Sequence, residues 1–488
     1  MKIWVLNPPF LAKFSRPQRS PAVTKSGTLY FPIWLAFATG VLEQAGHEVI
    51  LTDAPARGLT ETDILEMGRS IGPALIIMDT STPSIENDIR VAGALKAILP
   101  NTVIVFVGTH VSALPEETLM AASAVDAVAR KEYEFTLREL ASVLEKSSGR
   151  GSDIFSSIAG LSYRKGSQIV HNPDRPFISN LDELPWVSRV YAKHLNISDY
   201  FNPNALYPMV TLITSRGCPF LCRFCLYPQT MTGRKYRVRS VEDVVEEIRF
   251  VQKSFPNVKS IFIEDDTLTV NKNRLIAFSE ALIKSDVRLP FVANSRIDLD
   301  LETMKMMKAA GCQQLCVGFE SGNQEILNEM RKGTKIGQMT AFMENARKAG
   351  ILIHGCFMVG FPGETKETAE QTIQLALQLN PDTVQFYPVM VYPGTEAYRD
   401  YCDKGWMETH NFRNWLTPEG LHNCVIRNDA FAPADLVQWC DNARRRFYLR
   451  PSYITYKLRQ IVTHPALAHR TVKAAVTFFR YLISGSRA

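Results

Sequence analysis

The sequence lacks the features that mark exported and membrane-spanning proteins. Its 488 residues contain no run of about 18 uninterrupted apolar residues, the length that a membrane-spanning helix needs. The segment before Pro8 and Pro9 is too short to serve as a secretory signal. No cysteine precedes Cys218, and the total of nine is odd, which argues against a disulfide framework. We therefore expect a cytoplasmic protein.

Acidic residues are missing from the end of the chain. Residues 442–488 contain ten Lys or Arg and no Asp or Glu, whereas residues 1–441 carry 45 basic and 49 acidic groups. The formal net charge of +6 thus comes from a basic tail on a mildly acidic body, which is not the evenly basic surface of a nucleic-acid-binding protein. We expect no nucleic-acid partner. With 46% hydrophobic and 21% charged residues, the chain has the composition of folded domains.

Two common phosphate-binding motifs are also missing. No Gly-x-Gly-x-x-Gly follows the first predicted strand, and no Gly-x4-Gly-Lys-Ser/Thr occurs in the chain. Without these glycine-rich turns the backbone cannot form the usual cradle for the phosphates of NAD or ATP. Sites of these two kinds are therefore not expected.

Residues 1–148 alternate short apolar runs with helical patterns. Runs such as 103–107 show no polar alternation, which is typical of strands buried on both faces of a parallel sheet. We predict a doubly wound, flavodoxin- or Rossmann-like α/β domain. Its strands are expected at 2–6, 48–52, 74–78, 102–107 and 124–129, and its helices near 34–45, 85–99 and 132–144.

Three further regions follow this domain. Residues 149–208 indicate a polar, proline-punctuated linker with a β-hairpin near 161–171. Residues 209–398 repeat a strand–helix rhythm that fits a partial (β/α)6 barrel of the TIM type better than a full eight-fold one. Residues 399–488 are predicted to be a mainly helical extension that ends in the basic tail. The barrel strands are expected at 209–215, 258–264, 290–294, 314–319, 352–359 and 383–389, and helices at 241–254, 272–284 and 364–379.

Three cysteines, Cys218, Cys222 and Cys225, fall within eight residues directly after the first predicted barrel strand. Loops at the C-terminal ends of strands are where β/α barrels place their sites. Three thiolates can bind three irons of a [4Fe-4S] cluster and leave one iron open to another ligand. A structural zinc site normally has four ligands, and no nearby His or Cys completes such a set. Three other cysteines on predicted barrel strands are interpreted as core residues: Cys312, Cys316 and Cys356.

The Cys-x3-Cys-x2-Cys spacing, with an aromatic residue before the last cysteine, resembles the radical S-adenosylmethionine (SAM) superfamily. The resemblance implies that the open iron binds the amino and carboxylate groups of SAM, and that reductive cleavage of SAM yields a 5′-deoxyadenosyl radical. Segments at the ends of later barrel strands match that family in order. The implied SAM-binding residues are Phe224, Glu264, Asp265, Asn294, Arg296, Glu320, Ser321 and Gly360. For Arg296, a surface salt bridge is the competing interpretation.

The α/β domain in front of the barrel resembles the cobalamin-binding members of that superfamily. Small residues follow two of its strands, where the resemblance implies that a flat corrin lies against the strand ends. The implied cobalamin contacts are Thr80, Ser81, Thr82, Ser84, Gly108, Thr109, His110 and Glu132. The Asp-x-His-x-x-Gly signature of a lower axial histidine is absent, so His110 is interpreted as a loop residue rather than as a cobalt ligand. The family's Arg-Gly-Glu is Arg-Lys-Glu here, which puts a tight turn at Lys131 in question.

These resemblances predict a cobalamin-dependent radical SAM enzyme whose cofactors are a [4Fe-4S] cluster, SAM and cobalamin. The simplest activity is a methyltransferase that methylates an unactivated carbon of a small substrate. The alternative is a cyclase, oxidase or rearrangement enzyme similar to the anaerobic magnesium-protoporphyrin ester cyclase. A tRNA methylthiotransferase would need cluster cysteines in the first domain, and a sensor would not need the SAM-contacting segments. The resemblance also implies a flavodoxin- or ferredoxin-type electron donor, and no catalytic residue is assigned.

The basic tail contains an apolar helical pattern, formed by Val472, Val476, Phe479 and Ile483. Such a helix could lie on an anionic membrane surface or pack its apolar face on the barrel. Relatives with similar tails act on lipid-like or isoprenoid substrates. We therefore include peripheral membrane contact through the tail, and a lipid-like or natural-product substrate, among the expectations.

Overall fold

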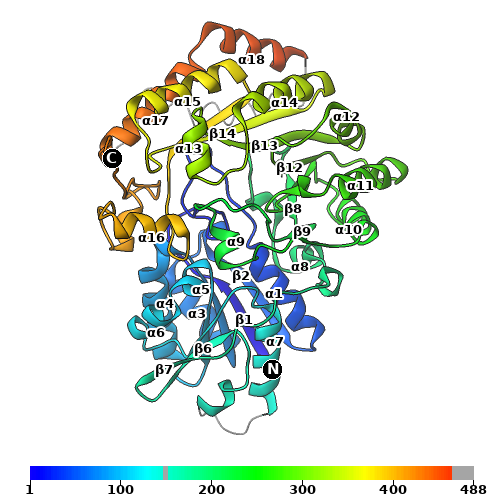
Figure 1. Ribbon diagram of the computed structural model, residues 1–488. Coiled ribbons are helices and arrows are strands. Elements are labelled where there is room, and N and C mark those ends of the chain that lie inside the picture. Colours follow the sequence, from blue (N-terminus) through cyan, green and yellow to red (C-terminus); the bar gives the residue numbers. More distant parts are fainter. Residues whose placement is uncertain (147–151, 464–488) are drawn as a thin grey trace.

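The computed structural model describes residues 1–146 and 152–463, and it contains two large sheets, one in each half of Figure 1. The first sheet has the strand order β2-β1-β3-β4-β5-β6-β7, and β1 to β5 are parallel. Both β3 and β4 are buried along their whole length, as expected for strands covered on both faces. The parallel strands are β1 (Lys2–Asn7), β2 (Glu48–Asp53), β3 (Leu75–Thr80), β4 (Val103–Gly108) and β5 (Ala127–Ala129).

Helices cover both faces of the first sheet, which confirms the doubly wound domain. One face packs on α1 (Ile33–Gln44) and α7 (Glu134–Lys146), and the other on α4 (Ile85–Ile98) and its neighbours. The sequence analysis missed α3, which begins at a capping box between Thr60 and Asp63 and buries few residues. The remaining helices are α2 (Ala54–Arg57), α3 (Glu61–Ile71), α5 (Thr109–Ala113) and α6 (Pro115–Ala121).

The predicted hairpin near 161–171 is present and extends the first sheet. Its strands β6 (Leu161–Lys165) and β7 (Gln168–His171) are antiparallel, and β6 pairs with the edge strand β5. The chain then passes through α8 (Val187–His194) to the second sheet. The region after residue 148 therefore contributes two strands to the N-terminal sheet instead of only connecting the two halves.

The second sheet has six parallel strands in the order β15-β14-β13-β12-β11-β8, which confirms the partial barrel. Its strands are β8 (Met209–Leu212), β11 (Ser260–Ile263), β12 (Phe291–Ser295), β13 (Cys312–Glu320), β14 (Leu352–Val359) and β15 (Thr383–Pro388). Its helices are α10 (Val241–Ser254), α11 (Lys272–Lys284), α12 (Leu301–Ala309), α13 (Gln324–Glu329), α14 (Ile336–Ala349) and α15 (Lys366–Leu379).

The first barrel strand is shorter than predicted, and this shapes the cysteine segment. After β8 the chain leaves the sheet, and β9 (Ser215–Arg216) pairs antiparallel with β10 (Arg237–Val238). This small ribbon encloses the three cysteines and the short helix α9 (Leu226–Thr230). In Figure 1, α9 lies between the two large sheets.

The C-terminal extension is mainly helical over its described part. It contains α16 (Glu396–Asp403), α17 (Pro433–Tyr448) and α18 (Pro451–Thr463). The hydroxyl of Tyr448 on α17 donates to the carbonyl of Val384 at 2.6 Å, so α17 covers the edge strand β15. The helix predicted at 472–483 lies outside the described residues. Within 1–146 and 152–463, no helix combines the length and apolarity that a membrane crossing requires.

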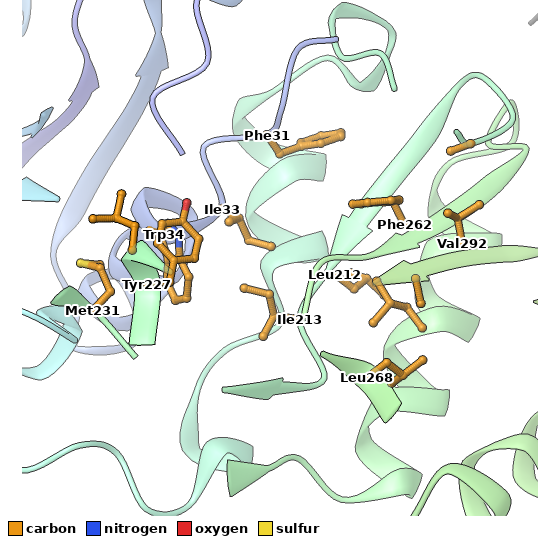
Figure 2. Packing of buried hydrophobic residues seen from close by; sticks show 14 of the residues in the cluster. Phe31, Ile33, Trp34, Leu212, Ile213, Tyr227, Met231, Phe262, Leu268 and Val292 are labelled. Atoms are coloured by element: carbon orange, nitrogen blue, oxygen red, sulfur yellow. The ribbon is translucent and has the colours of Figure 1, made fainter. Parts of the chain in front are cut away.

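The two halves share a buried interface around α9. Figure 2 shows Trp34 of α1 beside Tyr227 and Met231, and the Trp34 and Tyr227 rings meet edge to face at 5.7 Å. Buried charges also pair across this interface, because Arg216 of β9 donates to Glu134 of α7 at 2.7 Å. The cysteine segment of the barrel therefore rests directly on the first domain.

Candidate functional site

The three predicted cluster ligands lie together on the segment that joins β9 to α9. Cys222 is buried, whereas Cys218 and Cys225 are half-buried, and none of the three is in a disulfide. Gly217 begins the segment at φ +83°, and a Cβ there would lie 2.2 Å from the Lys235 carbonyl oxygen. Only glycine lets the two strands of the ribbon approach this closely. The turn before Cys218 therefore requires glycine, because the backbone near Lys235 passes close to it.

The environment of these thiols disfavours free thiolates. Burial raises the pKa of Cys218, and burial together with Asp266 raises the pKa of Cys225 well above its ordinary value. A bound metal reverses this, because a coordinated thiol is deprotonated. Among residues 1–146 and 152–463, no three Cys, His, Asp or Glu side chains are spaced for a single metal ion. The cysteines of a four-iron cluster each bind a different iron, so the donor set fits a cluster.

Two carboxylates at the end of β11 face the cysteine segment. Glu264 is buried and binds Arg19, which also donates to the backbone carbonyl of Asp265 at 2.9 Å. Asp266 accepts from Thr232 at 2.8 Å and lies 3.8 Å from Arg19. Burial raises the pKa of both carboxylates, and the Arg19 charge opposes that shift. The sequence analysis missed Asp266 and Arg19.

Asp265 points away from this cluster. Its carboxylate accepts hydrogen bonds from the backbone and hydroxyl groups of Thr214 and Ser215, at 2.6 to 3.1 Å. Both carboxylate oxygens are thereby used to hold the corner between β8 and β9. The structure therefore places Asp265 as a support for the cysteine ribbon, next to the Glu264 and Asp266 pair.

Glu320 ends β13 in an unusual backbone conformation. Its φ of +67° is rare for a residue other than glycine, and its carboxylate accepts from Lys332 at 2.7 Å. Burial alone would lower the pKa of Lys332, but the neighbouring Glu320 charge raises it. The sequence analysis did not select Lys332. Ser321 lies apart from this pair, because its hydroxyl is 3.3 Å from that of Thr372 on α15.

Arg296 is buried rather than on the surface. Its guanidinium lies 3.7 Å from the centre of the Phe220 ring, within the cysteine segment, and donates to the Lys332 carbonyl at 2.9 Å. It also pairs with Asp298 at 3.1 Å, so the salt bridge considered in the sequence analysis exists, between a buried guanidinium and an exposed carboxylate. Asn294 donates to the Asp265 carbonyl at 3.1 Å, the same oxygen that Arg19 contacts.

The last two predicted SAM contacts border the barrel mouth. The Phe224 ring lies edge to face with Phe361 at 6.2 Å. Gly360 has φ +107°, and its backbone amide donates to Glu364. Burial raises the pKa of Glu364 to about 7, although the Gly360 and Phe361 amides oppose that shift. These residues form an ordered turn at the end of β14.

Buried polar atoms without partners identify where a ligand fits in the barrel. Among the described residues, Glu264 Oε2, Asp266 Oδ1 and Glu320 Oε2 have no hydrogen-bond partner. A buried carboxylate oxygen normally has one, and its absence carries a free-energy cost. An ammonium group is a suitable partner because it donates up to three charge-assisted hydrogen bonds. These oxygens near the thiols therefore fit SAM beside a cluster.

The loops after β3 and β4 lie against each other at one edge of the first sheet. The Thr80 hydroxyl donates to the Val107 carbonyl at 2.7 Å, and a Cβ on Gly108 would lie 2.5 Å from the Thr80 carbonyl oxygen. The hydroxyls of Ser81 and Ser84 are 2.8 Å apart, and Ser84 donates to Asp88 at 2.6 Å. Because their side chains are small, these strand ends have no bulky groups that protrude from the edge of the sheet. Such an edge is suited to a flat ligand.

His110 follows this edge on the short helix α5 and is not in a loop as predicted. Its Nδ1 is 3.1 Å from the Thr82 hydroxyl, and its ring lies edge to face with Phe412 at 5.1 Å. Burial lowers its pKa to about 3. Thr109, beside it, is also buried. The expectation that His110 bonds its own turn is therefore wrong, because its ring contacts Thr82 of the neighbouring loop after β3.

Glu132 lies at the interface between the domains instead of at the strand-end edge. Arg237 of β10 donates to both of its carboxylate oxygens, at 2.7 and 2.8 Å. The adjacent Lys131 has φ +61°, so lysine adopts here the conformation that glycine favours. The turn questioned in the sequence analysis therefore forms, and it directs Glu132 toward the cysteine ribbon.

The other barrel cysteines differ in burial. Cys312 is fully buried, as expected for a core residue, but Cys316 and Cys356 are only partly buried. Burial raises the pKa of Cys356 to about 12, and Glu320 contributes to that shift. The core interpretation therefore fits Cys312 better than the other two.

Two family models match the chain. The model described as the radical SAM superfamily matches residues 212–376, and the model described as the B12 binding domain matches residues 19–141. The first match contains the three cysteines and the strand ends with Glu264 and Glu320. The second contains the loops after β3 and β4.

Similar proteins cover nearly the whole chain. An uncharacterized methyltransferase, PH0819, of Pyrococcus horikoshii is 31% identical over 439 residues, which are 90% of this chain and 92% of that protein. The anaerobic magnesium-protoporphyrin IX monomethyl ester cyclase of Rubrivivax gelatinosus is 27% identical over 434 residues, covering 87% and 75%. The solved structure of the radical SAM methyltransferase TsrM from Kitasatospora setae shares the fold, with a TM-score of 0.69, 18% identity and coverage of 90% and 82%. The chain therefore belongs to the radical SAM superfamily, among the members that carry a B12-binding domain in front of the radical SAM domain.

Proposed function

We propose that this protein is a cobalamin-dependent radical SAM enzyme that transfers a methyl group to a carbon of a small substrate. The observation that carries the proposal is the placement of three thiols beside buried carboxylate oxygens that have no partner. When bound, the cluster with SAM supplies a carbon-centred radical and cobalamin supplies a methyl carrier. The protein positions these groups and excludes water.

The barrel residues divide into ligands and supports. Cys218, Cys222 and Cys225 would hold the cluster, and Glu264 with Asp266 would accept hydrogen bonds from the amino group of SAM. Asp265 holds the ribbon, and Lys332 fixes the orientation of Glu320. Arg296 stacks on Phe220 and so fixes one side of the cysteine segment.

In the first domain, the loops after β3 and β4, which carry small side chains, would contact the corrin. Thr80, Ser81, Gly108 and Thr109 lie at these strand ends with small side chains. The hydrogen bond between His110 and Thr82 holds the imidazole against the neighbouring loop after β3. This favours a corrin that lies on the loops without a protein histidine on its cobalt.

The alternative activity, cyclisation or oxidation, has support of its own. The cyclase from Rubrivivax gelatinosus matches 87% of this chain, whereas the 31% identical relative is named a methyltransferase. The two activities differ in the fate of the SAM methyl group. That fate can be measured without knowledge of the substrate.

The test uses the full chain reconstituted anaerobically with iron, sulfide and cobalamin. The reduced holoenzyme receives methyl-labelled SAM, and the bound cobalamin and the deoxyadenosine are measured separately. Label in the cobalamin fraction supports methyl transfer. Unlabelled cobalamin with deoxyadenosine formation supports the cyclase or oxidase activity, and failure to bind cobalamin contradicts the proposal for the first domain.

We also propose two interactions that the same reaction would use. Reduction of the cluster requires an electron donor, for which a flavodoxin or ferredoxin has suitable chemistry. The helix α18 exposes an apolar stripe, Ile454 (46%), Leu458 (61%) and Val462 (79%), in a region that has basic but no acidic residues. This combination favours an anionic bilayer surface as the partner and a lipid-like molecule as the substrate.

Vesicle binding tests the membrane proposal. The full chain should sediment with phosphatidylglycerol vesicles and not with phosphatidylcholine vesicles, and added salt should reduce binding. Leu458→Glu should weaken binding, while Met120→Glu, another exposed apolar residue on α6, should not. Equal binding by both variants and the parent chain would contradict a role for α18.

A further inference from the structure

The segment between β1 and α1 connects the two candidate cofactor sites. Within it, residues 16–20 pass from the loop after β3 to the end of β11, and we call these residues the strap. At the first end, Arg16 is fully buried and donates to Asp88 at 2.6 Å and to Ser84 at 3.2 Å. It also donates to the side chain of Asn7 at 2.8 Å. The strap is thereby anchored at the predicted cobalamin loop.

The other end of the strap is anchored at the predicted SAM site. Arg19, only three residues after Arg16, pairs with Glu264 and lies 3.8 Å from Asp266. The hydroxyl of Ser20 is 3.0 Å from the hydroxyl of Tyr392 and 3.0 Å from Nε2 of His422. One short piece of chain therefore carries an arginine to each site.

The middle of the strap occupies the space over the strand ends of the first sheet. Arg16 and Pro17 line a cavity of about 10 Å³ together with Thr80, Gly108 and Thr109. A cavity of this size holds one water molecule at most, whereas drug-sized ligands occupy pockets of about 300–1,000 Å³. Tyr227 of α9 donates to the Pro17 carbonyl and closes the other side. A corrin can reach Thr80 and Gly108 only if groups that close this cavity move, and the strap is one of them.

The chemistry at Arg19 supplies a cause for that movement. Arg19 is the cation that faces Glu264 and Asp266, and its side chain is 31% exposed, so it can leave without crossing the core. In the proposed function, SAM brings its ammonium group to the same carboxylates. Arg19 already pairs with Glu264 and lies 3.8 Å from Asp266, so an ammonium group that binds these carboxylates competes with Arg19 for the same acceptor oxygens.

We infer that the strap couples the two cofactor sites: Arg19 is the resident cation at Glu264 and Asp266, SAM displaces it, and release of the strap opens the space over Thr80 and Gly108. Arg19 is then a positioning residue, and SAM and cobalamin bind with positive cooperativity because each removes the same obstacle. The coupling must be reciprocal, so each ligand tightens the other by the same factor. The inference rests on the proposed function, because it takes SAM and cobalamin as the ligands.

The test measures equilibrium binding before any turnover. Holoprotein with its cluster is titrated with cobalamin, followed by absorbance, in the absence and in the presence of saturating SAM. For the parent chain we expect SAM to tighten cobalamin binding at least about fivefold, the lower end of typical allosteric coupling. In Arg19→Gln the strap has lost its contacts with Glu264 and Asp266, so cobalamin should bind tightly without SAM and the factor should fall to about one. SAM itself should bind Arg19→Gln at least as tightly as it binds the parent chain.

The matched control is Arg90→Gln, which removes an exposed arginine that pairs with Glu61 on the first domain. It should keep the full coupling factor. A second measurement needs no variant: hydrogen exchange of the amides in residues 16–20 should increase when SAM is added to the cluster-bound protein. Both measurements depend on the position and mobility of the strap and not on the rate of the enzymatic reaction.

Three results would overturn the inference. The coupling factor of Arg19→Gln could equal that of the parent chain, SAM could bind this variant more than tenfold more weakly, or the strap amides could gain protection with SAM. The second result would make Arg19 a SAM ligand. A parent chain that binds SAM and cobalamin without coupling contradicts only this inference, whereas a parent chain that binds neither contradicts the proposed function as well.

Discussion

The two candidate cofactor sites differ in how their polar groups are satisfied. Around the loops after β3 and β4, the hydroxyls and charges bond one another, as in the chain from Ser81 through Ser84 and Asp88 to Arg16. At the barrel mouth, the carboxylates of Glu264 and Glu320 each keep one oxygen without a partner. The barrel site is therefore electrostatically prepared for a ligand, whereas the first site is closed until other groups move.

This difference indicates two ways of binding a large cofactor. The proposed barrel site would recognise charge, because buried carboxylates and thiols gain most from a cation or a metal. The proposed site in the first domain would recognise shape, because its strand ends present small residues and a close backbone contact at Gly108. Substitutions that remove charge should therefore affect the barrel ligand, and substitutions that add volume should affect the ligand of the first domain.

The largest effect is expected from Cys222→Ser. Loss of one of the three proposed cluster ligands should remove the iron–sulfur absorbance and abolish deoxyadenosine formation from SAM. Cobalamin binding should change little, because Cys222 belongs only to the barrel site. Cys402→Ser, which changes a half-buried cysteine on α16, is the control. Deoxyadenosine formation by Cys222→Ser would show that the barrel site does not depend on its three thiols.

Substitution of the neighbours Asp265 and Glu264 should have different effects, because Asp265 supports the fold and Glu264 is proposed to bind the ligand. Asp265→Asn loses acceptors from a carboxylate that holds four hydrogen bonds, so the free energy of unfolding should fall by about 2–4 kcal/mol. Glu264→Gln should be destabilised much less but should bind SAM about tenfold more weakly, as expected for one charge-assisted hydrogen bond. Denaturant unfolding and SAM titration of both variants check this. If Glu264→Gln lost stability and Asp265→Asn lost SAM affinity instead, Glu264 would be the support and Asp265 the ligand-binding residue.

Added volume at the first site should act on cobalamin alone. Gly108→Ala places a Cβ 2.5 Å from the Thr80 carbonyl oxygen at φ +112°, which should cost about 1–3 kcal/mol of stability and weaken cobalamin binding. SAM binding should be unchanged. Gly93→Ala on α4, where a Cβ meets nothing within 4 Å, should leave cobalamin binding intact. Equal cobalamin affinities in the two variants would argue against a ligand at this edge.

The smallest effect is a pH dependence that belongs to the first site. The pKa of His110 is lowered from 6.5 to about 3 by burial, so between these values the unfolded chain binds a proton that the folded chain does not. Stability from this group is complete above pH 6.5 and is lost as the pH falls. Relative to His110→Gln, the parent chain should lose about 1 kcal/mol between pH 7 and 5.5 in denaturant unfolding. An identical pH dependence of both proteins would contradict a neutral, buried His110.

Local patterns were sufficient to predict the two halves of the fold. Uninterrupted apolar runs such as 103–107 identified buried parallel strands, because covering both faces of a strand leaves no room for polar alternation. The helix α3 was missed because it buries little and is stabilised by its capping box. The position of the hairpin after residue 160 was predicted, but its pairing with β5 depends on residues far apart in the sequence.

The sequence by itself was enough to predict a cluster site at the three cysteines, the order of the barrel segments, and a flat ligand at the small residues that end strands of the first domain. These are local features, since ligand spacing and strand periodicity are set by neighbours along the chain. Only the tertiary structure decided that Asp265 is a support, that Glu132 faces the barrel and that Arg16 and Arg19 reach separate sites. An arginine in a loop carries no local signal of its partner, because its charge is satisfied by carboxylates 72 and 245 residues away.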